Sequence, residues 1–158
     1  PRQLRGAEVV MYWTGLTVVD CVSGRWQKVS GQPLRLRTGE YPSISVHGDA
    51  LAFEPNRRIG LEPLAVASTL PKQGDPVWLL APARGTESLV HGGRWLGVED
   101  DWCLYRLDNQ GLDMVGTSGG AVVNADHQVI GIHVAAGDSD QGVISIASPI
   151  RPLIGALQ

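Results

Sequence analysis

Short apolar runs separated by turn residues extend along most of the chain. The runs are rich in β-branched and aromatic residues, several of them alternate with polar positions, and glycine or proline recurs about every 8 to 12 residues. This pattern is typical of an all-β barrel or sandwich and not of repeated βαβ units. The expected strands are 7–13, 16–22, 34–38, 43–47, 50–54, 76–82, 88–98, 102–107, 121–125, 128–135 and 142–147.

The spacing of apolar residues allows a helix only at 149–157, where two prolines weaken it. A loop containing proline and glycine separates two groups of strands. We therefore expect an N-terminal β-barrel over 1–66, a connection over 67–75 and a C-terminal β-barrel over 76–158.

The composition supports a packed globular domain. The chain has 158 residues, of which 43% are hydrophobic and 18% charged, which excludes a disordered segment or a coiled coil. The net charge of −3 argues against a dominant role in nucleic-acid binding. RNA binding by a local basic patch remains an alternative to a solvated strand face for four arginines, Arg35, Arg37, Arg57 and Arg58.

The two cysteines and the apolar runs bear on the compartment. Cys21 and Cys103 are far apart and lack the spacing of a metal site, so we expect free, buried thiols in a reducing compartment. No run approaches the length of about 20 residues that spans a membrane, and no secretory leader is visible. The sequence therefore predicts an intracellular protein with no metal, no other cofactor and no membrane segment.

The stretch "GTSGG" at 116–120 places Ser118 among glycines. One interpretation is a simple turn between strands. The other is a nucleophile held on a tight turn, with backbone N–H groups directed at an oxyanion.

The longer stretch "GTSGGAVVNADHQVIGIHVAA" resembles the nucleophile region of chymotrypsin-like serine proteases. The segment "HGDALAFEP" (47–55) resembles the one that carries the triad acid, which points to Asp49, and "GDPVWLLAP" (74–82) resembles the first strand of the second barrel. The resemblance implies two six-stranded antiparallel Greek-key barrels with the active-site cleft between them. It also implies that Ser118 is the nucleophile and that Gly116 and Ser118 supply the oxyanion-hole N–H groups.

The segment "LTVVDCVSG" (16–24) resembles the one that carries the triad base, but Asp20 stands where the family has histidine. Aspartate, with a pKa near ~3.9, is a far weaker base, and Asp49 would repel it. The chain is then an inactive form, natural or engineered, unless the nearby His47 substitutes as the base. Asp20 and Asp49 also fit a simpler role as turn residues.

The strand "GIHVAAG" (131–137) resembles the G-x-H-x-x-G strand of viral main proteases of the picornavirus and nidovirus type. That likeness implies that His133 lies at the base of the S1 pocket and donates a hydrogen bond to a substrate Gln or Glu. The alternative is a histidine satisfied within the core. Substrate backbone is expected along Val134, Ala135 and Ala136, and Asp113 occupies a position where these enzymes often carry a threonine that partners the histidine.

Three functions follow. The first is a serine endopeptidase that cuts a viral polyprotein after Gln or Glu, with which the final residue, Gln158, agrees. The second is a catalytically dead module that binds an extended peptide, which Asp20 favours. The third is a housekeeping protease of the HtrA type, whose serine turn is similar. All three predict a polypeptide partner, and the sequence leaves the oligomeric state open.

Overall fold

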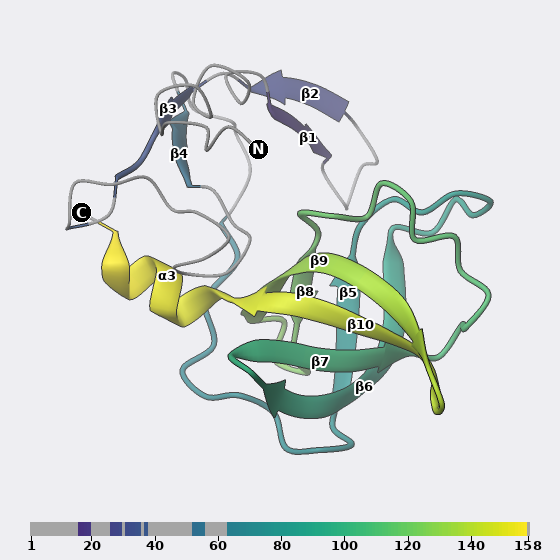
Figure 1. Cartoon of the computed structure of the whole chain (residues 1–158). Helices are drawn as coiled ribbons and strands as arrows, with labels where there is room; N and C mark the ends of the chain where they lie inside the picture. Colours follow the sequence, from purple (N-terminus) through teal and green to yellow (C-terminus); the bar gives the residue numbers. More distant parts are fainter. Residues whose placement is uncertain are drawn as a thin grey trace, which may run out of the picture.

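The computed structural model describes residues 16–19, 26–29, 31–35, 37, 52–55 and 63–157. Nearly all of the C-terminal half is therefore described, together with short pieces of the N-terminal half (Figure 1). The predicted residues Asp20, His47 and Asp49 lie outside the described residues.

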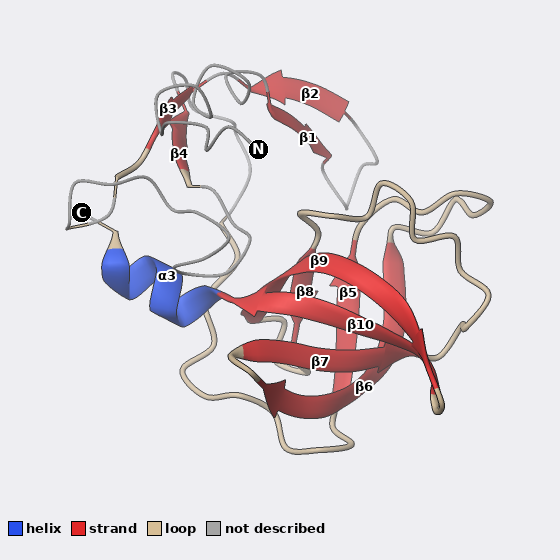
Figure 2. Ribbon diagram, in the orientation of Figure 1, coloured by secondary structure: helices blue, strands red, loops and turns tan. Residues whose placement is uncertain are grey.

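Six antiparallel strands form a closed barrel in the C-terminal half (Figure 2). Their order around the barrel is β10-β7-β6-β5-β8-β9. Because the barrel is closed, each strand has a neighbour on both sides wherever it is paired. The barrel confirms the all-β prediction for this half of the chain. The strands are β5 (Pro76–Leu80), β6 (Val90–Glu99), β7 (Trp102–Leu107), β8 (Ala121–Val123), β9 (Val129–Ser139) and β10 (Gly142–Pro149).

A short helix, α3 (Ile150–Ala156), follows β10 directly. The expected helical spacing at 149–157 is thus confirmed. Pro149 is the N-cap residue and Pro152 lies in the first turn, where a missing N–H leaves no intrahelical hydrogen bond unmade. The prolines therefore mark the start of the helix and do not prevent it. No described helix has the length and apolar character needed to cross a membrane.

The described part of the N-terminal half contains two two-stranded sheets and no closed second barrel. One sheet pairs β1 (Leu16–Val19) with β2 (Trp26–Val29), and the other pairs β3 (Gly31–Pro33) with β4 (Phe53–Pro55). The prediction of a strand at 34–38 was wrong at the described positions 34, 35 and 37, which are coil or turn. The backbone N–H of Arg37 instead donates to the carbonyl of Ala156 at the end of α3, at 2.8 Å.

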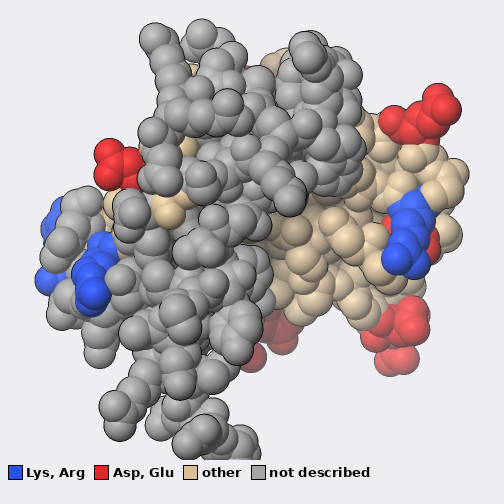
Figure 3. Space-filling view, turned by 90° about the horizontal axis from the view of Figure 1, so that it is seen from above, with Lys and Arg blue, Asp and Glu red and all other residues tan. Residues whose placement is uncertain are grey.

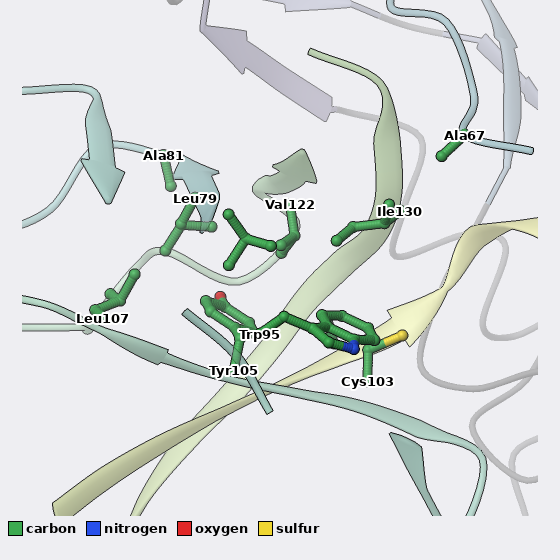
Figure 4. Packing of buried hydrophobic residues seen from close by; sticks show 11 residues of the cluster. Ala67, Leu79, Ala81, Trp95, Cys103, Tyr105, Leu107, Val122 and Ile130 are labelled. Atoms are coloured by element: carbon green, nitrogen blue, oxygen red, sulfur yellow. The ribbon is translucent and has the colours of Figure 1, made fainter. Parts of the chain in front are cut away.

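The core of the barrel is formed by inward-facing residues that alternate along the strands. In β7 every second side chain is buried, which gives the two-residue period expected of a half-buried strand. The large side chains of Trp95 and Tyr105 fill the centre, and Leu79 and Val122 lie among the smaller side chains around them (Figure 4). Cys103 is a free, buried thiol, as predicted, and burial raises its pKa to about 11. Cys21 lies outside the described residues.

The connection before the barrel is held against it by backbone hydrogen bonds. Ala67 N–H donates to Val129 O at 2.9 Å, and Val129 N–H donates to Ala65 O at 2.8 Å. The Arg151 guanidinium donates to Ser68 O from the first turn of α3. These contacts tie the connection to β9 and to the helix.

Candidate functional site

The serine turn, residues 114–120, is built from local hydrogen bonds and two left-handed glycines. Met114 O accepts from the backbone N–H of Thr117 at 3.2 Å and from its hydroxyl at 2.7 Å. Gly116 and Gly119 have φ of 89° and 88°, a region that residues with a Cβ rarely adopt. Gly116 and Gly119 are therefore required by the backbone path that presents Ser118.

Within the stretch 116–120, two backbone N–H groups are unpaired among the described residues. The N–H groups of Gly116 and Ser118 donate to no described acceptor, whereas those of Thr117, Gly119 and Gly120 all do. Unpaired N–H groups two residues apart on a tight turn form a cradle for a negatively charged oxygen. They are the two donors that the sequence predicts for the oxyanion hole.

The Ser118 side chain is exposed, and its hydroxyl has one partner among the described residues. It donates to the carbonyl of Val134 at 2.9 Å. Val134 is the extra residue of a β-bulge, since Ala135 pairs with Ile146 whereas His133 pairs with Ala147. Bulges next to active sites redirect backbone groups, and here the carbonyl of the bulged residue meets the serine.

An unpaired strand edge begins at the same point. β9 pairs with β8 only as far as Ile132, opposite Ala121. Beyond it, Ala135 and Ala136 pair on one side only, with β10, and the bulged residue Val134 has no described strand partner. This edge, predicted from the sequence to hold substrate backbone, thus starts beside Ser118 and can accept an added strand.

His133 lies between the serine turn and the core. Its backbone N–H donates to Gly120 O and its carbonyl accepts from Gly119 N–H, both at 2.8 Å. The side chain is 2% exposed, and its Nδ1 is 2.7 Å from the hydroxyl of Tyr105. Burial lowers the pKa of His133 to about 4, so the imidazole is neutral at pH 7.

The partner of His133 is Tyr105, which no sequence motif indicated. The hydroxyl of this fully buried residue approaches the imidazole from β7, with the two rings edge to face at 6.0 Å. Within "WCLYRL" it has the position of an ordinary core aromatic, and no local signal distinguishes it.

Asp113, which stands at the position of the family threonine, makes no hydrogen bond to the His133 imidazole among the described residues. Its Oδ1 accepts a hydrogen bond from Val115 N–H at 3.0 Å, which stabilises the loop before the serine turn. An isolated antiparallel bridge also joins Asp113 to Arg84. In the structure, Asp113 supports the loop that leads into the serine turn.

Other surface features do not add to this site. A cavity of about 520 Å³ lies between the connection, the β6–β7 turn and the start of α3, and none of the predicted site residues lines it. On the face in Figure 3, described Lys and Arg side chains stand at separate places with acidic side chains near them. Arg37, one of the four arginines considered for RNA, donates through Nε to Leu157 O at 3.4 Å. Arg57 and Arg58 lie outside the described residues.

Comparison with known proteins identifies the fold. No family model and no curated protein matches the sequence. Among solved structures, the Rv3671c protease in an inactive form matches with a TM-score of 0.64 and 18% identity, over 96% of this chain and 75% of that one. The MamO protease domain of Magnetospirillum magneticum matches with a TM-score of 0.57 and 19% identity, over 94% and 78% of the two chains. The chain has a chymotrypsin-like protease fold.

An inactive serine-to-alanine mutant of Rv3671c from M. tuberculosis also matches, with a TM-score of 0.58 and 18% identity, over 82% of this chain. The present chain spans only 64% of the length of that one. Both organisms are bacteria, so these comparisons give no support to the viral type suggested by "GIHVAAG". The structural similarity establishes the fold. At identities below 20%, the activity of this chain has to be proposed from its own site.

Proposed function

We propose that this protein recognises an extended polypeptide and that its site is built for serine endopeptidase chemistry. The observation that carries this is the meeting of an exposed serine, two unpaired N–H groups and an unpaired strand edge at Ser118. None of these three features is specific for catalysis when it occurs alone. Together they supply a nucleophile, an oxyanion cradle and a backbone register for the substrate.

The substrate backbone adds to β9 along Val134, Ala135 and Ala136. Main-chain hydrogen bonds to an unpaired edge give affinity without dependence on side chains. A substrate N–H directed at Val134 O competes for the carbonyl that the Ser118 hydroxyl occupies in the free protein. Peptide binding therefore releases the hydroxyl, which is then free to attack a carbonyl whose oxygen lies between the N–H groups of Gly116 and Ser118.

The residue before the cut is Gln in preference to Glu. With Nδ1 of His133 occupied by Tyr105, Nε2 is the ring nitrogen left for a ligand. A neutral imidazole that donates through Nε2 pairs with the oxygen of a carboxamide, but it does not neutralise a carboxylate removed from water. Substrates that lack a side-chain acceptor leave this buried donor unpaired and are rejected. Cleavage of a viral polyprotein remains a prediction that depends on the "GIHVAAG" motif.

Activity depends on a base for Ser118, and the sequence offers Asp20 at the position of the family histidine. Because aspartate is a weak base, the unaltered chain is expected to bind peptides without cutting them. The hydrogen bond from Ser118 to Val134 O favours this second function, a peptide-binding module, since the hydroxyl has no described base as partner. A housekeeping protease of the HtrA type would share the fold but not the selection for Gln.

The test compares the unaltered chain with Asp20→His on peptides that differ only in the residue before the cut: Gln, Glu or Leu. We expect both proteins to bind the Gln peptide most tightly and only Asp20→His to cleave it. Ser118→Ala in the Asp20→His background should lower kcat by at least about 10³-fold while leaving peptide affinity unchanged.

Two results would contradict parts of this assignment. Binding without cleavage by Asp20→His would support the peptide-binding module. Absence of both binding and cleavage for every peptide would overturn the site at Ser118 altogether. Affinity is measured by calorimetry and cleavage by mass spectrometry, so that each part has its own readout.

A further inference from the structure

We propose that a second cavity, of about 270 Å³, binds a guanidinium group, the cation of an arginine side chain. The cavity lies between the loop that joins β5 to β6 and the loop that follows β7. His91, Gly92 and Asp108 line it, and no residue of the serine turn does. The site is therefore separate from the one proposed at Ser118 and does not depend on that function.

His91 presents a ring nitrogen to this cavity. Its side chain is 8% exposed, and Nε2 is 3.0 Å from the carbonyl oxygen of Ala81. Because a carbonyl only accepts, Nε2 of the neutral ring carries the proton and Nδ1 keeps a lone pair. No described residue pairs with Nδ1, and no fully buried side-chain nitrogen or oxygen in the described part of the chain lacks a partner. Nδ1 is therefore accessible from the cavity and can accept a hydrogen bond there.

Asp108 supplies a negative charge at the rim of the same cavity. Its side chain is exposed, and its carboxylate has no hydrogen bond or ion pair among the described residues. A Cβ added to Gly92 would lie 3.4 Å from Oδ2 of Asp108. Gly92 directly follows His91, so the carboxylate and the imidazole belong to one small region of the lining.

The other polar groups of the lining favour a ligand that donates hydrogen bonds. The Ser88 hydroxyl donates to Val90 O at 2.8 Å, so its proton is already used. Neither Lys nor Arg occurs among the described residues that line the cavity. A carboxylate and an imidazole lone pair, with no cation in the lining, match a cation that carries several N–H groups.

A guanidinium meets these requirements better than an ammonium. Its planar fork donates two parallel hydrogen bonds to a carboxylate and has further N–H groups for the imidazole. It is also more weakly hydrated than an ammonium, so its entry into a partly enclosed cavity costs less desolvation. The ligand is therefore an arginine side chain of a polypeptide or a free guanidino compound, which share this group.

The first test titrates the protein with matched ligands at about pH 8, followed by ¹H–¹⁵N NMR. The ligands are Nα-acetyl-arginine amide, its lysine and citrulline counterparts, and ethylguanidine. Citrulline keeps the size and N–H groups of arginine without the charge. We expect the arginine derivative to bind at least about tenfold more tightly than the lysine and citrulline derivatives, with shifts at 86–92 and 107–112.

The same titration can overturn the site. Equal affinity for the citrulline derivative, tighter binding of the lysine derivative, or shifts confined to 114–120 and 133–136 would each do so. Ethylguanidine identifies the source of the group. Equal affinity for ethylguanidine would support a site for the guanidinium alone, and tighter binding of the arginine derivative would support an arginine within a polypeptide.

The second test changes the two acceptors. Asp108→Asn removes the charge and should weaken binding of the arginine derivative by about tenfold to 100-fold, the worth of a hydrogen bond to a charged group. His91→Gln keeps an N–H donor for Ala81 O but removes the Nδ1 acceptor, so it should weaken binding by about threefold to tenfold. Gly92→Ala places a methyl group in ordinary contact with Asp108 and should also weaken binding.

Asp126→Asn is the matched control. Asp126 is an exposed aspartate between β8 and β9, at the end of the barrel opposite the serine turn. The change should leave the affinity for the arginine derivative unaltered. Equal losses in Asp108→Asn and Asp126→Asn, or no loss in Asp108→Asn, would overturn the site. Asp108→Asn alters an exposed position, so it decides the question even where His91→Gln fails to fold.

Discussion

The serine turn and the buried pair of His133 and Tyr105 are adjacent in space but are constructed in opposite ways. The serine turn is held by hydrogen bonds between residues three positions apart, it depends on two left-handed glycines, and Ser118 is exposed. The His133–Tyr105 pair joins β9 to β7 across 28 positions of the sequence, and both side chains are buried. The side chain of Ser118 can therefore be replaced at little cost in stability. Replacement of His133 or Tyr105 instead affects both ligand recognition and the folding of the barrel.

The largest expected difference between the two regions is in stability. Tyr105→Ala removes a fully buried ring and leaves His133 Nδ1 without its partner, so it should lower the free energy of unfolding by roughly 3–5 kcal/mol. Urea denaturation followed by circular dichroism measures this. A loss below about 1 kcal/mol would show that the His133–Tyr105 pair is not part of the stable core.

The pH dependence should identify His133 as the buried titrating group. Burial lowers its pKa to about 4, whereas an unfolded histidine titrates near 6.5. Between these pH values the unfolded chain binds more protons, so stability is greatest above about pH 6.5 and is lost as the pH falls towards 4. The full contribution is about 3 kcal/mol.

Urea denaturation at several pH values, with His133→Gln as the control, tests this contribution. The variant lacks the titrating group, so its stability should fall less between pH 7 and pH 4.5. Equal losses in the two proteins would assign the pH dependence to other groups.

The backbone of the serine turn should be more sensitive than its side chain. Gly116 has φ of 89°, so Gly116→Ala should cost about 1–2 kcal/mol through strain, although no neighbour would contact the added Cβ within 4 Å. Gly155→Ala is the matched control, since Gly155 lies in α3 and also has open space around a Cβ. That change should raise stability by up to about 1 kcal/mol. Similar effects of both changes would contradict the required left-handed conformation.

The smallest effect is expected at Ser118 itself. Its side chain is exposed and makes one hydrogen bond, to Val134 O, so Ser118→Ala should change the free energy of unfolding by less than about 0.5 kcal/mol. Thermal and urea denaturation give the value. A loss above 2 kcal/mol would make the serine a structural residue of the turn and weaken its assignment as a nucleophile.

Local sequence was sufficient to predict the all-β class, the C-terminal barrel and the serine turn. Alternation along strands such as β7 and the glycines at 116 and 119 are local signals, because strand periodicity and left-handed φ depend on residues close together in the chain. The candidate oxyanion donors and His133 also followed from local motifs, with a family resemblance to interpret them. At the described positions of the strand expected at 34–38 the prediction was wrong, and the backbone of Arg37 pairs there with the end of α3, far away in the sequence.

The surroundings of those residues depend on contacts between distant parts of the chain. Barrel register places Tyr105 and Ser145 opposite one another and brings the tyrosine to His133, across separations that no sequence period encodes. The bulge at Val134 and the start of β8 at Ala121, opposite Ile132, together create the unpaired edge beside Ser118. Burial then lowers the pKa of His133, since the cost of charging an imidazole depends on the solvent that neighbouring strands exclude.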